Sequence, residues 1–327
     1  MLTLTDYDHD LVSALVREFV DAVRPGQEHL FSCVYRSEDL PDQHQVFLIA
    51  VGEDRFALKL DTASGETGRL AREFAVLERL AKYFEGSERS DVIHPVYLSP
   101  TGQFFVTEYV DRKMAKDVIY EMDEARAGQA FRRAGAWLND LHAFRKPERA
   151  AFYPNWMVEE AEALVARGPL AEAEDYRPML RSLVADAKAL EGAEESHVFS
   201  HGDFHSRNLI LGPGKAIGLD FADAGKKLAV YDIADFLKSD AVRPAAPEGL
   251  DRSGISQGAK EMFFRQYRHE VNPEILDLCL RGRLLIDWLA ITPDIAARTA
   301  FQRRKFELVR DRLTHVFRNP ICEGGQV

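Results

Sequence analysis

The chain has 327 residues, of which 46% are hydrophobic and 29% charged, and its formal net charge is −11. This length and composition are typical of a globular protein with a large buried core, and they exclude an intrinsically disordered chain. The acidic excess argues against nucleic acid as a partner, because binding to a phosphate backbone requires clustered Lys and Arg side chains.

The number and spacing of the cysteines, and the absence of long apolar runs, bear on the cellular location of the protein. Cys33, Cys279 and Cys322 are odd in number and far apart, so they predict neither a disulfide framework nor a paired metal motif. The first ten residues lack the pattern of a signal peptide, and no apolar run approaches the roughly 18 residues that a membrane span requires. We therefore expect a cytoplasmic protein with no membrane partner. Its oligomeric state is left open.

The first third of the chain reads as a small sheet with helices. Helical spacing over residues 11–23 is followed by strand-like runs at 30–35, 46–51 and 55–60. An amphipathic helix then presents apolar residues from Leu70 to Phe84, and two further strands are expected at 96–99 and 104–109. This order predicts an α+β lobe over residues 1–110, built on an antiparallel sheet with one main helix.

From about Asp111 onward the pattern changes to helices. The region 155–195 and most of the chain from 230 to 317 have helical spacing, and a short strand at Val198-Phe199 leads into the loop 201–208. We therefore expect a second, mostly helical lobe over residues 111–327, and we see no internal repeat.

The loop His201-Gly202-Asp203-Phe204-His205-Ser206-Arg207-Asn208 carries the strongest chemical signal. Asp203 is positioned to accept the proton of an attacking hydroxyl, which makes it the predicted catalytic base. Asn208 and Asp220 offer oxygen ligands of the kind that Mg²⁺ prefers. One base with two such ligands is what phosphoryl transfer from a metal-bound nucleotide needs, so we predict ATP and Mg²⁺ as cofactors.

The same loop admits a second interpretation, as a metal-dependent hydrolase. His201, Asp203 and His205 are residue types that bind Zn²⁺ or Fe. The other eight histidines are scattered, however, and no second cluster of metal-binding residues follows the loop. His201 is better interpreted as a buried residue that stabilises the loop.

A nucleotide site is predicted upstream. Lys59 lies inside an apolar strand, where a lysine is costly to bury unless it is paired, and Glu73 on the following helix is its natural partner. Such a lysine contacts the α- and β-phosphates of a nucleotide, while the glutamate orients it. The last strand of the first lobe ends at Glu108, so the Glu108 carbonyl and the Val110 amide are candidates to bind an adenine edge.

Taken in order, these motifs resemble the aminoglycoside phosphotransferase and choline kinase-like branch of the protein-kinase fold over about residues 28–240. His205 stands where most protein kinases have a lysine, and the run from Leu138 to His142 is similar to the helix that precedes the catalytic region in that branch. The resemblance implies that Asp232 braces the catalytic loop through backbone N–H groups, with His201 and His205 in support. It also implies a two-lobed kinase that phosphorylates a hydroxyl of a small molecule.

The sequence leaves open both the catalytic competence of the protein and the identity of the acceptor. The stretch from Phe31 to Leu48 contains no glycine, so a Gly-rich loop over the phosphates is absent, and a non-catalytic, nucleotide-binding regulatory relative remains an alternative. The acceptor is expected to be an amino sugar, an amino alcohol or a similar molecule, although a protein acceptor is possible on the same fold. The helices expected to wall its site carry acidic and aromatic residues: Glu159, Glu160, Glu162, Asp175, Asp287 and Trp288.

Overall fold

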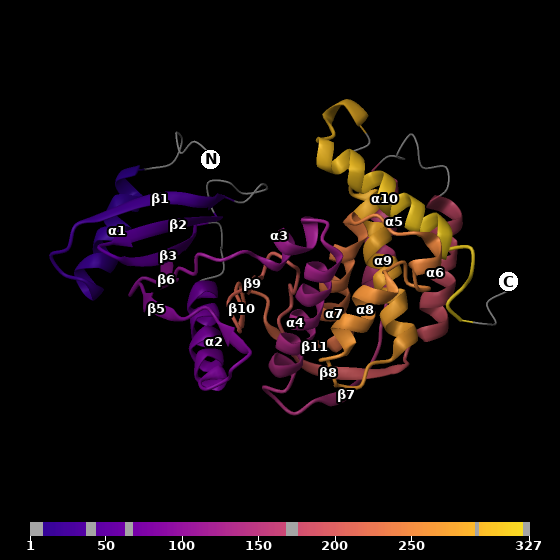
Figure 1. Ribbon diagram of the computed structural model, residues 1–327, viewed down its shortest axis with the longest axis horizontal. Coiled ribbons are helices and arrows are strands. Elements are labelled where there is room, and N and C mark those ends of the chain that lie inside the picture. Colours follow the sequence, from indigo (N-terminus) through magenta and orange to yellow (C-terminus); the bar gives the residue numbers. More distant parts are fainter. Residues whose placement is uncertain (1–8, 37–43, 63–67, 168–175, 292–293, 323–327) are drawn as a thin grey trace. The chain divides into compact units, whose positions relative to one another are not determined.

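The computed structural model describes residues 9–36, 44–62, 68–167, 176–291 and 294–322 (Figure 1). The chain divides into two compact units, one made of residues 1–112 and 212–224 and the other of residues 113–211 and 225–327. Residues 212–224 fall within the second lobe expected from the sequence, and the lobe boundaries stay a prediction. This segment belongs to the first unit because its strand β10 (Ala216–Gly218) pairs in parallel with β4 (Ser90–Val92), a strand that the sequence pattern did not indicate.

The first unit is built on a five-stranded antiparallel sheet with the order β1-β2-β3-β6-β5. Its strands are β1 (His29–Arg36), β2 (His44–Val51), β3 (Asp54–Asp61), β5 (Pro95–Leu98) and β6 (Phe104–Glu108). Gly52 has a φ of 58° in the two-residue turn that joins β2 to β3, a conformation that glycine adopts without strain. All five strands lie where the sequence predicts them.

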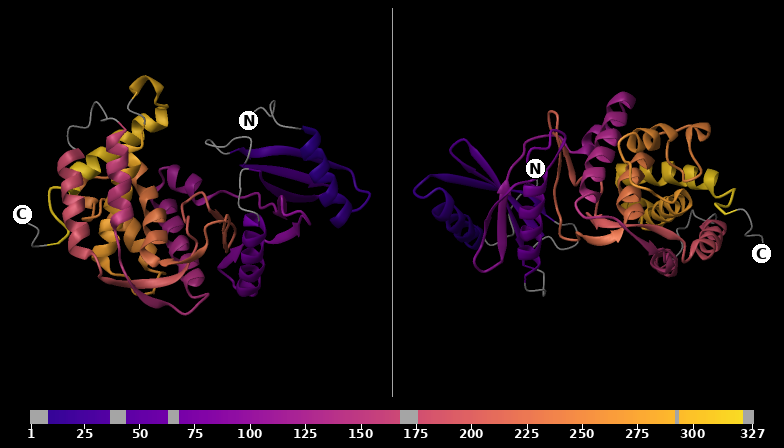
Figure 2. Two further views of the ribbon diagram at one scale, coloured as in Figure 1. Left: turned by 180° about the vertical axis from the view of Figure 1, so that it is seen from behind. Right: turned by 90° about the horizontal axis from the view of Figure 1, so that it is seen from below.

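The two helices of this unit pack on opposite faces of the sheet (Figure 2). Helix α1 (His9–Val23) buries Val16 and Phe19 against Phe47 and Ile49 of β2, which forms one apolar core. Helix α2 (Arg69–Phe84) contacts β5 and β6 on the other side, where Phe74 meets Phe105 edge to face. Lys59 projects from the same face as Phe105, because paired residues of neighbouring strands share a face.

The second unit is mostly helical. Its helices are α3 (Ala115–Tyr120), α4 (Glu124–His142), α5 (Asn155–Ala166), α6 (Tyr176–Leu190), α7 (Ala229–Leu237), α8 (Gln257–Phe264), α9 (Pro273–Leu289) and α10 (Ala300–Val316). Helix α9 is buried along most of its length and contacts α5, α6, α7 and α10. Strands β7 (Glu148–Ala151), β8 (Glu194–Ser200) and β11 (Gly225–Leu228) form a small antiparallel sheet, and β9 (Leu209–Leu211) follows the loop 201–208.

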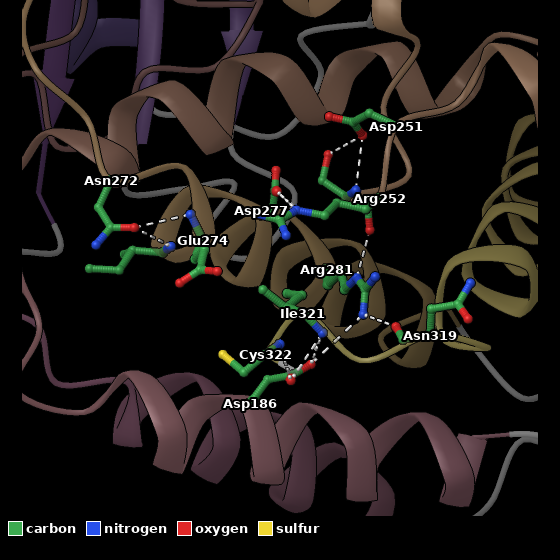
Figure 3. Close-up of polar contacts among 12 residues, drawn as sticks. Asp186, Asp251, Arg252, Asn272, Glu274, Asp277, Arg281, Asn319, Ile321 and Cys322 are labelled. Atoms are coloured by element: carbon green, nitrogen blue, oxygen red, sulfur yellow. Dashed lines mark hydrogen bonds and ion pairs between the residues drawn. The ribbon is translucent and has the colours of Figure 1, made fainter. Parts of the chain in front are cut away.

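A buried polar network holds the end of the described chain against α6 and α9 (Figure 3). The carboxylate of Asp186 accepts hydrogen bonds from the backbone amides of Ile321 and Cys322. Arg281 donates to the carbonyl of Asn319 at 2.9 Å and to that of Arg252 at 2.7 Å. None of the helices in the described ranges combines the length and hydropathy needed to cross a membrane.

Candidate active site

Lys59 lies at the centre of a charged cluster in the first unit. Its Nζ is 2.9 Å from both carboxylate oxygens of Glu73 and 2.8 Å from Oδ1 of Asp220. Glu73 is almost completely buried, whereas the Asp220 side chain is 42% exposed. The pair predicted from the sequence is therefore present, and Asp220 contacts the same ammonium group.

The charges of this cluster hold one another in place. Burial alone would lower the pKa of Lys59, but the negative charges of Asp220 and Glu73 outweigh burial and raise the pKa above its ordinary value. Burial also raises the pKa of Glu73, and the Lys59 charge opposes that shift. Lys59 therefore stays charged, which is what binding to phosphate oxygens requires.

Asp220 has a φ of 64°, in the left-handed region that residues other than glycine adopt rarely. Aspartate tolerates this conformation better than most residues, because its short side chain bonds to nearby backbone groups. The turn directs the Asp220 carboxylate toward Lys59, and the sequence pattern carried no signal for this backbone conformation.

The sheet face that carries Lys59 also carries an apolar strip that the sequence analysis missed. Ser32 pairs with Leu48, and Leu48 with Ala57, so these side chains share one face with Lys59. Leu30 on the same face of β1 is 77% exposed, which is unusual for a leucine in a strand. The uninterrupted apolar run Val46–Val51 was the available signal, because alternate residues of a strand point to opposite faces and both faces are then apolar.

Backbone hydrogen bonds connect the end of β6 to the chain on both sides of it. The Glu108 amide donates to the His94 carbonyl at 3.0 Å, and the Tyr109 amide donates to the Arg55 carbonyl at 3.1 Å. The Glu108 carbonyl accepts a hydrogen bond from the Thr107 hydroxyl at 3.0 Å and retains a second lone pair. Roles for Glu108 and Val110 in binding adenine remain predictions.

The loop 201–208 of the second unit is organised around Asp203. The side-chain amide of Asn208 donates to the Asp203 carbonyl at 2.9 Å and to its carboxylate at 3.3 Å. His205 Nε2 lies 3.4 Å from the same carboxylate, and the Asp203 side chain is 48% exposed. The base predicted from the sequence is therefore accessible and held by two neighbours.

Asp232 holds the start of this loop through hydrogen bonds to its backbone. Its carboxylate accepts hydrogen bonds from the amides of His201 at 2.8 Å and of Gly202 at 3.0 Å. His142 Nε2 lies 3.0 Å from the same carboxylate, and His142 Nδ1 lies 2.7 Å from the Tyr267 hydroxyl. The contact of His142 with Asp232 was not predicted, and the available signal was the position of His142 at the end of the run Leu138–His142.

Aromatic packing supports the other side of the loop. The Phe204 ring stacks on Trp137 and on Phe236, with centroid distances of 5.1 and 4.9 Å. The His201 ring is fully buried beside Trp137, and its Nδ1 lies 3.4 Å from the Asp203 amide nitrogen. These contacts favour a structural role for His201.

Asn208 and Asp220, the ligands predicted for a magnesium ion, both have a side-chain oxygen that fits this role. Because the Asn208 side-chain nitrogen is turned toward Asp203, its oxygen is directed away from that residue and fits the role of a neutral ligand. The exposed carboxylate of Asp220 fits the second ligand. In the described ranges, no group of three or more His, Cys, Asp or Glu residues is arranged to hold a metal ion.

Two of the acidic and aromatic residues expected to wall the acceptor site are occupied by other contacts in the structure. Asp287 lies 2.9 Å from Lys305 and 3.5 Å from Lys238, so its charge is already paired. Trp288 is fully buried against Phe306. Of the rest, Glu159, Glu160 and Glu162 lie on partly or fully exposed positions of α5, and Asp175 is outside the described residues.

Comparison with known proteins identifies the family. The model of the phosphotransferase enzyme family matches residues 41–271, whereas no curated protein matches the chain at a significant level. Among solved structures, the chain is similar to the amicoumacin kinase hAmiN in complex with AMP-PNP, Ca²⁺ and Ami, with 17% identity, a TM-score of 0.58 and coverage of 97% of this chain and 98% of that one.

Two further structures have the same fold. A choline kinase from Cryptosporidium parvum Iowa II is 13% identical, with a TM-score of 0.56 and coverage of 93% of this chain and 95% of that one. A glucosamine kinase in complex with glucosamine, ADP and inorganic phosphate is 19% identical, with a TM-score of 0.57 and coverage of 90% and 82%. These similarities confirm the α+β fold and the family resemblance expected from the sequence. The chain belongs to the phosphotransferase enzyme family and is a phosphotransferase with a protein-kinase-like fold.

Proposed function

We propose that this phosphotransferase transfers the γ-phosphate of ATP, in a Mg²⁺-dependent reaction, to a hydroxyl group of a small molecule. The observation that carries the proposal is the half-exposed Asp203 carboxylate, on a loop that Asp232 holds through two backbone amides. An accessible carboxylate on such a rigid support is suited to deprotonating a bound alcohol. Amino sugars and amino alcohols are among the candidate acceptors, and no role for nucleic acid is proposed.

In this reaction the acceptor hydroxyl gives its proton to Asp203 as its oxygen forms a bond to the γ-phosphorus. The bond between that phosphorus and the oxygen bridging to the β-phosphate breaks, and ADP leaves. Lys59, oriented by Glu73, binds the α- and β-phosphates. If Mg²⁺ is bound, Asn208 and Asp220 would each hold it through a side-chain oxygen, and the ion would supply positive charge to the nucleotide phosphates.

The apolar strip formed by Leu30, Leu48 and Ala57 supports a site for the nucleotide base on the first unit. Contact with such an apolar surface would stabilise a bound planar base. Lys59 lies two residues after Ala57 on the same face of β3. Glu108 and Val110 would bind the base edge through backbone groups. Because the stretch from Phe31 to Leu48 contains no glycine, it supplies no Gly-rich loop over the phosphates. In this proposal Lys59 and Mg²⁺ bind the phosphates instead.

The test is an assay of acceptor-dependent ADP release with Mg-ATP, followed by phosphorus NMR of the product. We expect a phosphate ester on an alcohol oxygen and loss of turnover when Mg²⁺ is chelated. Nucleotide binding without ester formation would instead favour the non-catalytic alternative. Cys33, Cys279 and Cys322 are free thiols, which supports assay under reducing conditions and a cytoplasmic location.

A further inference from the structure

A series of contacts leaves the catalytic loop at Ser206 and runs through α3 to α10. The Lys116 amide donates to the Ser206 carbonyl at 2.8 Å, which places the start of α3 on the loop. The Lys116 ammonium lies over the Tyr120 ring, 5.9 Å from its centroid, one helical turn further on. Tyr120 in turn stacks on Phe301 of α10 at 6.0 Å. One basic group and two aromatic rings therefore follow one another from the start of α3 to α10.

The series continues from α10 to α9 and α7 through ion pairs. Lys305, one turn after Phe301, lies 2.9 Å from Asp287 of α9. Asp287 is 3.5 Å from Lys238, and Lys238 is 3.3 Å from Asp235 of α7. Burial would raise the pKa of Asp287, but the charges of Lys238 and Lys305 outweigh burial and hold it below the ordinary value.

The same contacts lead back to the loop. Arg283 lies 3.1 Å from Asp235, and its guanidinium stacks over Trp156 at 4.5 Å. The Trp156 indole nitrogen donates to the Tyr231 hydroxyl at 3.3 Å. Tyr231 directly precedes Asp232, which binds the amides at the start of the loop. The contacts thus begin and end on the loop that carries Asp203. We call the charged members of this series other than Asp232 the basic ring: Lys116, Asp235, Lys238, Arg283, Asp287 and Lys305.

The basic ring carries a positive excess in an acidic protein. It has four cationic and two anionic side chains, which leaves a net charge of +2, whereas the whole chain has a net charge of −11. The side chains of Lys238, Arg283 and Lys305 are 23%, 25% and 24% exposed, so they are partly desolvated and still within reach of a ligand. Partly desolvated charges bind an opposite charge more strongly than solvated ones do.

We propose that the hydroxyl acceptor carries a carboxylate or phosphate group, which binds the basic ring while the acceptor hydroxyl faces Asp203. This inference rests on the proposed function and specifies its acceptor class. Arginine and lysine bind anionic oxygen groups through charge-assisted hydrogen bonds, and Trp156, Tyr231, Tyr120 and Phe301 offer apolar contacts for the rest of the molecule. Asp235 and Asp287 each pair with two cations of the protein. Their negative charges are therefore balanced and do not favour binding of an amine.

The first experiment compares acceptors that share a hydroxyl and differ in charge. Glycerol, glycerate, glycerol phosphate and serinol form one set, and glucose, gluconate, glucose 6-phosphate and glucosamine form another. We expect an anionic member to exceed its neutral parent at least about tenfold in kcat/KM, the effect of one additional charged hydrogen bond, and this preference to weaken with added salt. Comparison of carboxylates with phosphates identifies the anion. Preference for a neutral or cationic member would overturn the inference and leave the proposed function standing.

The second experiment does not depend on the identity of the acceptor. Malonate is titrated into the full chain saturated with Mg-ADP, and binding is read by calorimetry in wild type, Lys305→Gln, Lys305→Arg and the control Lys188→Gln at an exposed position of α6. We expect Lys305→Gln to weaken malonate binding about tenfold, with Lys305→Arg and the control close to wild type. Equal affinity in all four proteins would overturn the inference. Failure to bind Mg-ADP would count against the proposed function instead.

Discussion

The carboxylate of Asp232 and the imidazole of His142 form a buried pair, with 3.0 Å between Oδ2 and Nε2 and both side chains almost completely excluded from solvent. Because the same carboxylate binds the amides of His201 and Gly202, the pair ties the catalytic loop to α4. The Tyr267 hydroxyl is in position to donate to Nδ1, so a neutral imidazole satisfies both of its ring nitrogens.

Replacing Asp232 by Asn should destabilise the protein strongly. An amide offers one acceptor oxygen where the carboxylate offers two, so a buried backbone donor or the imidazole loses its partner. We expect a decrease of about 3 kcal/mol in the free energy of unfolding, measured by urea denaturation. The exposed Asp21→Asn on α1 is the matched control and should stay within about 0.5 kcal/mol of wild type. A loss as small as that of the control would contradict the bracing role of Asp232.

The buried imidazole should make stability depend on pH. Burial lowers the pKa of His142, against the opposing effect of Asp232, so the folded protein keeps the imidazole neutral where the unfolded chain binds a proton. The free energy of unfolding should therefore fall as the pH drops below about 6.5, the ordinary value for histidine. His142→Gln should be less stable at neutral pH and lose this component of the pH dependence. Parallel pH profiles for the two proteins would show that His142 does not titrate as described.

Lys59→Met should weaken nucleotide binding and leave the buried Glu73 without its main partner. We expect the dissociation constant of Mg-ADP, measured by calorimetry, to rise at least about tenfold, because a charge-assisted contact to phosphate is lost. Lys82→Met, on the exposed surface of α2, is the matched control and should bind as wild type does. Unchanged affinity in Lys59→Met would remove Lys59 from the nucleotide site.

Two glycines of α4 should respond in opposite ways to alanine. A Cβ at Gly135 would lie 2.1 Å from the Phe263 carbonyl oxygen of α8, whereas one at Gly128 would lie 3.6 Å from the Met262 side chain. Gly135→Ala forces the two helices apart and should destabilise the protein by about 2 kcal/mol or more. Gly128→Ala should be neutral or stabilise it by up to about 1 kcal/mol, through better helix propensity. Thermal unfolding distinguishes the two, and equal effects would contradict the close contact of α4 with α8.

Local patterns in the sequence were sufficient to predict the sheet strands and the pair between Lys59 and Glu73. Alternation in β1–β3 and the helical spacing of α2 are short-range signals, and a lysine in an apolar strand requires a nearby partner. The role of Asp232 came from family resemblance. Its partner His142 lies 90 residues away in the sequence, and Tyr267, the partner of His142, lies 125 residues from that histidine. No local pattern indicates such contacts.

The acceptor residues show the limit of residue type as a predictor. Asp287 and Trp288 have side chains that could receive a cation, yet one is paired with two lysines and the other is buried. Partners and burial are properties of tertiary packing, which the sequence of α9 alone does not reveal. The positive φ of Asp220 is a similar case, because aspartate tolerates this conformation and its local sequence does not show whether it adopts it.

The most direct test of the account is the turnover of Asp203→Asn with Mg-ATP and the best acceptor found. The variant keeps the size of the side chain and the hydrogen bond from Asn208 to the backbone carbonyl, and loses only the group that takes the proton. We predict a fall in kcat of about 10² to 10⁴-fold, with Mg-ADP affinity and thermal stability close to wild type. Turnover within a few fold of wild type in the folded variant would contradict the assignment of Asp203 as the catalytic base.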